Sequence, residues 1–102
     1  MPDQFPGQLI GSGEAAGSAT AAAFTSRAAK WVRFIAANDN AGSVYIGGST
    51  VTKKAGTTTS TAGWALEPGK ESPLIRIPLD DFARLYRICD NAGDDVMYLL
   101  FD

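Results

Sequence analysis

Short runs of alternating side chains dominate the chain from residue 27 onward. In residues 30–36 bulky side chains fall on both faces of an extended strand, Trp31-Arg33-Ile35 on one and Val32-Phe34-Ala36 on the other. β-branched and aromatic residues of this kind favour a pleated sheet. Similar short runs occur at residues 44–46, 72–79, 85–89 and 96–101. Several short strands separated by regularly spaced turns predict an all-β fold, a small antiparallel β-sandwich or jelly-roll-like barrel.

Two of the expected turns carry the same four residues, Asp39-Asn40-Ala41-Gly42 and Asp90-Asn91-Ala92-Gly93. Asp and Asn tolerate turn backbone and a glycine closes each segment, so both are expected to be hairpin turns. The first would join residues 30–36 to 44–46, and the second would join 85–89 to 96–101. An internal duplication and a shared turn chemistry explain the repeat equally well. In the run 72–79, two prolines favour an edge strand because proline lacks a backbone N–H.

The first quarter of the chain has a different composition. Residues 1–26 consist mostly of Gly, Ala, Ser and Thr, and their large apolar residues are Phe5, Leu9, Ile10 and Phe24. Small residues bury little area, and glycines lose much entropy on ordering. We therefore predict an extended N-terminal arm over residues 1–26 that orders against another subunit through those four side chains. A disordered segment is the alternative. Residues 27–102 would form the β domain, with a long Thr-rich loop at 50–63.

The composition excludes several classes of site. The 102 residues contain no histidine and one cysteine, and the formal net charge is −2. A Cys/His zinc site, a Ser-His-Asp triad and an intrachain disulfide cannot be built from this set. A mildly acidic chain without a basic run is expected to bind nucleic acid poorly, because neutralising the phosphates needs clustered Lys and Arg. The acidic start and the absence of an apolar run of about 20 residues argue against a signal peptide or membrane span. We expect no cofactor, no metal, no nucleic-acid partner and no membrane partner.

The remaining candidates for chemistry are weak. The pairs Asp80/Asp81 and Asp94/Asp95 could serve acid–base work only if two carboxylates converged, and adjacent residues on a strand point to opposite sides. Solvated turn residues are the preferred interpretation. The lone Cys89 is expected to be a buried structural thiol. Five aromatic residues could form a sugar-binding platform, although packing in the core is the simpler expectation: Trp31, Tyr45, Trp64, Tyr86 and Tyr98. These observations favour a non-enzymatic interaction or structural module.

Three strings carry a resemblance to a known family. They are Val44–Thr52 (VYIGGSTVT), Gly63–Ser72 (GWALEPGKES) and Leu79–Tyr86 (LDDFARLY). In this order, they resemble a strand, a turn and a second strand of small accessory virion proteins of tailed bacteriophages. The resemblance covers about residues 30–101. The chain departs from that pattern in its longer loop at 53–62 and in its Ala/Gly-rich N-terminus.

The resemblance implies a specific role. Proteins of this family act as capsid decoration or cement proteins, structural parts of the virion that bind the lattice of the major capsid protein and stabilise the head. They are often homotrimers at three-fold positions, and they join the capsid surface after assembly in the host cytoplasm. Two other functions stay open at this point. One is a carbohydrate-binding or receptor-binding β module, and the other is a structural component of the tail or neck.

Overall fold

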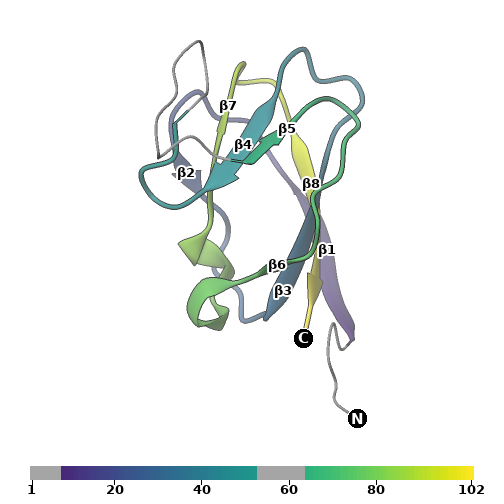
Figure 1. Cartoon of the computed structure of the whole chain (residues 1–102), viewed down its shortest axis with the longest axis vertical. Helices are drawn as coiled ribbons and strands as arrows, with labels where there is room; N and C mark the ends of the chain where they lie inside the picture. Colours follow the sequence, from purple (N-terminus) through teal and green to yellow (C-terminus); the bar gives the residue numbers. More distant parts are fainter. Residues whose placement is uncertain (1–7, 53–63) are drawn as a thin grey trace.

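A computed structural model describes residues 8–52 and 64–102, and in it the chain forms two antiparallel sheets that pack as a sandwich (Figure 1). In spatial order, the first sheet contains β1 (Leu9–Ala15), β8 (Val96–Phe101), β3 (Trp31–Ala36) and β6 (Ile75–Arg76). The second contains β2 (Ala22–Ala23), β7 (Tyr86–Cys89), β4 (Val44–Gly47) and β5 (Trp64–Leu66). Two short 3-10 turns, η1 (Pro78–Asp80) and η2 (Phe82–Arg84), precede β7. The prediction of an all-β sandwich is confirmed.

The core lies between the sheets and follows the alternation of the strands. The even-numbered residues of β3 point inward and are fully buried: Val32, Phe34 and Ala36. At the centre, the Phe24 ring stacks on Phe82 at 4.7 Å between centroids and lies 5.0 Å from Phe34. Tyr98 closes this aromatic cluster at 4.8 Å from Phe82. Burial of large rings supplies most of the hydrophobic stabilisation that a small domain can gather.

The two expected hairpins do not form, because each Asp-Asn-Ala-Gly segment connects one sheet to the other. β3 lies in the first sheet and β4 in the second, while β7 lies in the second sheet and β8 in the first. The first corner (residues 37–43) and the second corner (residues 90–95) bind each other instead. The Asn40 side chain accepts from the Asp95 N–H and donates to the Asp95 carbonyl, both at 2.8 Å. The hairpin prediction was wrong because these turn residues satisfy their hydrogen bonds across the two corners.

The strand order contains a two-fold equivalence. When β1–β4 are exchanged in order with β5–β8, the first sheet, β1-β8-β3-β6, becomes β5-β4-β7-β2. That sequence is the second sheet listed from its other edge. The first half of the chain (residues 8–47) and the second half (residues 64–101) therefore have the same topology. The repeated tetrapeptide occupies the equivalent corner in both halves.

The predicted arm is wrong for residues 8–26, which belong to the sandwich. β1 pairs with β8 along its length, from Leu9 opposite Phe101 to Ala15 opposite Val96. The segment that follows is fastened by Arg87, whose guanidinium donates to the carbonyls of Ala16 and Ala23 at 2.9 Å. Its small residues permit close approach, since a Cβ at Gly13 would lie 2.6 Å from the Tyr98 hydroxyl. The small side chains thus serve packing within this chain.

The segment 72–79 and the Thr-rich loop at 50–63 are the remaining parts of the predicted fold. The strand expected over 72–79 is only two residues long, because Pro78 starts the η1 turn. Leu79, inside this turn, has a φ of 54° and a largely exposed side chain. β6 is nevertheless an edge strand, as the prolines predicted. Of the Thr-rich loop, residues 53–63 lie outside the described residues, while Val51 is buried.

Candidate interaction surface

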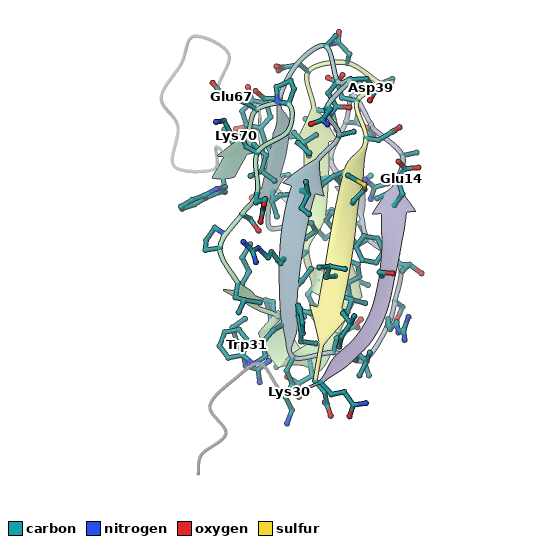
Figure 2. The ribbon with its side chains drawn as sticks, turned by 90° about the vertical axis from the view of Figure 1, so that its right-hand side faces the viewer. Glu14, Lys30, Trp31, Asp39, Glu67 and Lys70 are labelled. Atoms are coloured by element: carbon teal, nitrogen blue, oxygen red, sulfur yellow. The ribbon has the colours of Figure 1, made fainter. Side chains whose placement is uncertain are left out.

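The outward side of the first sheet is the best candidate for a functional surface. Strand pairing places Ile35 opposite Met97, and Met97 opposite Glu14. Two residues further along β8, Leu99 lies opposite Ser12. Directly opposed residues share a face, so these five side chains form one surface across β3, β8 and β1. We call these residues the open face, and Figure 2 shows the three strands turned toward the viewer.

A shallow hollow of about 410 Å³ lies on the open face. Its lining consists of Ser12, Gly13, Glu14, Ile35, Met97, Tyr98 and Leu99. Met97 is 38% exposed, and together with Ile35 and Leu99 it presents apolar surface to solvent. A concave surface with an apolar floor and a few polar groups at its rim is typical of a binding site.

The charges around the open face are unequally paired. Arg33 forms an ion pair with Glu71 beside the hollow. Near the lower end of the sheet in Figure 2, where Trp31 is labelled, Arg76 pairs with Asp80 at 2.7 Å. The Arg76 guanidinium also lies 5.8 Å from the Trp31 ring centroid. Glu14 is exposed at the end of β1 and has no ion-pair partner among the described residues. The hollow therefore has one uncompensated carboxylate at its rim.

The four side chains predicted to contact another subunit do not act together. Phe24 is 3% exposed in the aromatic cluster, and Ile10 packs against the same core. Leu9 is 52% exposed beside Phe101, so it can contact a partner. Phe5 lies outside the described residues.

Sequence reasoning missed the open face. One signal was available, namely that β3 and β8 both carry apolar residues on two faces, at Val32/Ile35 and at Val96/Met97. A strand that is apolar on both faces is covered on both faces in many proteins. Without the sheet order, nothing in the sequence says which of the two faces lacks a covering layer.

The aspartates are structural acceptors in this fold. Asp94 is 2% exposed, and its carboxylate accepts from the N–H groups of Ala41 at 2.8 Å and Asn91 at 3.1 Å. Burial alone would raise the pKa of Asp94, but the hydrogen bonds to its carboxylate lower the pKa below the ordinary aspartate value. Asp81 accepts from the Ala83 N–H at the start of η2, while Asp80 pairs with Arg76. Neither adjacent pair of aspartates converges on one point.

Other candidates are also dispersed. Cys89 is fully buried and burial raises the pKa of its thiol, as expected for a structural cysteine. Tyr98 and Tyr45 are largely covered, whereas Trp64 is 58% exposed at the start of β5. Within residues 8–52 and 64–102, no group of three acidic, His or Cys side chains could hold a metal ion. The same residues contain no helix of the length and apolarity needed to span a membrane.

Comparisons of the chain with protein-family models, with curated proteins and with solved structures found no match.

Proposed function

We propose that this chain is a non-enzymatic structural protein of a phage particle, a capsid decoration protein that binds the major capsid protein lattice and stabilises the head. The observation that carries the proposal is the open face, an exposed apolar surface on a rigid sheet. The resemblance of residues 30–101 to accessory virion proteins supplies the identity of the partner.

Repeated weak contacts can hold a small protein firmly on a symmetric shell. A hollow of about 410 Å³ can receive one or two apolar side chains from a neighbouring protein. A single contact of this size binds weakly, but a symmetric shell offers many equivalent sites and neighbouring capsomers to bridge. A sandwich whose strands are fixed by a shared core holds the open face in one geometry, which lowers the entropy lost on binding.

The experiment uses shells assembled from the major capsid protein of the phage that encodes the chain. The wild-type protein should co-sediment with these shells and raise their midpoint of thermal disruption. Met97→Lys should weaken attachment about tenfold or more, because a charge is then buried against an apolar partner. Leu79→Lys is the matched control, since Leu79 is 77% exposed but lies outside the open face. Absence of binding, or equal loss in both variants, would contradict the proposal.

One observation favours a second function, a carbohydrate-binding or receptor-binding module. The exposed Trp64 indole could stack on a sugar ring, which is how aromatic faces bind pyranoses. A titration with host polysaccharide should then shift the tryptophan emission spectrum, and Trp64→Ala should abolish the shift. Trp31→Ala is the control, because Trp31 is half-buried beside Arg76. No shift at saturating polysaccharide would rule out this function.

A further inference from the structure

The outer edge of β1 is the longest open strand edge in the described part of the chain. β1 spans seven residues and pairs only with β8, and Figure 2 shows it as the outermost strand on its side of the sheet. The other edge strands, β2, β5 and β6, span two or three residues. Proteins usually keep open edges short or covered, since an exposed edge pairs readily with another strand. A seven-residue edge is therefore a candidate interface.

The pairing pattern shows which backbone groups face this edge. The Ala37 N–H donates to the Asp95 carbonyl at 3.1 Å, so Asp95 is directed to the β3 side. Successive residues of a strand alternate sides, which turns the even-numbered residues of β8 toward β1. Their partners in β1 are residues 11, 13 and 15. The N–H and C=O groups of Ser12 and Glu14 consequently point away from the sheet, toward the open edge.

One end of the edge is already covered. A bulge interrupts the β1–β8 register between Leu9 and Gly11, and the Arg27 guanidinium donates to the Ile10 carbonyl there. The same guanidinium lies against Gly11, where it would clash with a Cβ. The open part of the edge is thus residues 11–15, with Gly13 at its centre.

We propose that β1 pairs with β1 of a second copy of this chain, antiparallel about a two-fold axis through Gly13. In this register, Ser12 of each copy lies opposite Glu14 of the other. Both residues direct their backbone groups to the open edge, so each pair exchanges two backbone hydrogen bonds. On the open face, the Ser12 hydroxyl can donate to the Glu14 carboxylate of the second copy, which satisfies the unpaired charge at the rim of the hollow.

The neighbouring registers are less favourable. An axis through Glu14 would place the two Glu14 carboxylates directly opposite each other, and like charges in that position repel. An axis through Ser12 would pair Glu14, on the open face, with Ile10, which packs against the core. At Gly13 the two strands form a non-hydrogen-bonded pair with Cα atoms about 4.5 Å apart, a separation that two glycines accept readily.

The dimer has a consequence for the surface. A two-fold axis perpendicular to the sheet keeps both open faces on one side, so the two hollows lie on one continuous eight-stranded sheet. This arrangement would double the number of contacts available to a repetitive partner. The dimer itself does not depend on the proposed role in a phage particle, since it forms between copies of the purified chain.

The test is sedimentation equilibrium of the purified full chain from about 1 µM to about 1 mM, a range in which small interfaces associate. The wild type should approach twice the 10.7 kDa mass of one chain. Ser12→Glu should weaken the dimer about tenfold, because it sets two carboxylates opposite each other twice. Ser12→Lys should tighten it, and Ser12→Glu combined with Glu14→Lys should recover the wild-type affinity.

Thr20→Glu is the matched control, because it adds a charge at an exposed position outside β1. Circular dichroism melting should confirm that every variant is folded. A wild type and a Ser12→Lys variant that both stay monomeric at the highest concentration would overturn the proposal. A trimer, or association that Ser12→Glu leaves unchanged, would overturn it as well. The two proposals fail separately, because shell binding by the wild type and self-association of the purified wild type are measured in different experiments.

Discussion

The two corners of the sandwich carry the same four residues at equivalent positions but bind in different ways. In the first corner, the Asn40 side chain reaches across to the backbone of Asp95. In the second corner, the Asn91 side chain donates to Asp94 within its own corner. The carboxylate of Asp94 also receives the Ala41 N–H from the first corner. The comparison teaches that equal sequence and equal topology do not fix equal hydrogen bonding.

The difference arises one residue beyond the repeat. By position in the repeat, the counterpart of Asp94 in the first corner is Ser43, which has no carboxylate. The N–H groups of Ala41 and Ser43 in the first corner therefore depend on carboxylates of the second corner, where Asp90 accepts from the Ser43 N–H at 2.9 Å. The carboxylates that accept hydrogen bonds across the junction of the two halves thus come from the second corner, from Asp90 and Asp94.

The largest expected effect comes from truncating the first half. Deleting residues 2–24 removes β1, β2 and Phe24, and each sheet then loses an edge strand. Because each sheet contains strands from both halves, we expect the second half to unfold too, with no cooperative transition in denaturant titrations. A deletion of residues 2–7 is the control and keeps every described contact. A cooperative transition in the longer deletion would restore the arm hypothesis.

The next largest effect on stability is expected at Asp94, whose carboxylate accepts hydrogen bonds from both corners. Asp94→Ala leaves the N–H groups of Ala41 and Asn91 without their acceptor in a buried site, so the free energy of unfolding should fall by about 3 kcal/mol. Asp39→Ala, at an exposed position of the first corner, should change it by less than about 0.5 kcal/mol. Urea denaturation at neutral pH measures both values. Equal changes in the free energy of unfolding would show that Asp39 and Asp94 contribute equally to stability, which would contradict this prediction.

A matched pair of glycines sharpens the comparison further. A Cβ at Gly42 would lie 2.6 Å from the Cβ of Asp90, whereas a Cβ at Gly93 would meet nothing within 4 Å. We expect Gly42→Ala to cost about 1–2 kcal/mol because the corners must separate. Gly93→Ala should be neutral or slightly stabilising, since it reduces the entropy of the unfolded chain. Thermal melts of the two variants decide the matter, and a reversed order would contradict the close approach of the corners.

The smallest effect is a dependence on pH. The folded pKa of Asp94 lies below the unfolded value of about 3.9, so its contribution to stability is present above about pH 4 and is lost as the pH falls through the folded pKa. Asp94→Asn cannot titrate at this position. The difference in unfolding free energy between wild type and Asp94→Asn should therefore shrink between neutral pH and about pH 3. A difference that stays constant with pH would mean that the hydrogen bonds of the corner do not lower the pKa of Asp94.

The sequence predicted the strands better than their partners. The alternation of residues 30–36 predicted a strand there, although not which of its faces is buried, and the prolines of 72–79 predicted an edge strand. These signals are local, since they depend on side-chain period and backbone preference. The assignment of β4 and β8 to opposite sheets depends on distant hydrogen bonds, such as those between Asn40 and Asp95, and has no local signal.

The small residues of the first quarter led to the wrong prediction of an arm for a physical reason. Glycine lowers both the helical and the strand preference of an isolated segment, and alanine lowers the strand preference, which favours the interpretation as an arm. In the folded chain the same residues are required by neighbours that come from far along the sequence. Gly13 lies under the Tyr98 hydroxyl, and Gly17 lies against the Asp94 carbonyl. Likewise, the open face could be recognised only after the sheet order placed Met97 beside Glu14.

The position of β8 also constrains how the chain is made. This strand follows all the other described strands in the chain, yet it lies inside the first sheet between β1 and β3. Until Val96–Phe101 has left the exit tunnel, β1 has no neighbour in its sheet, and β3 can pair only with the two residues of β6. Contacts between residues so far apart in sequence also slow folding. The first sheet is therefore completed only when β8 becomes available, in one late step.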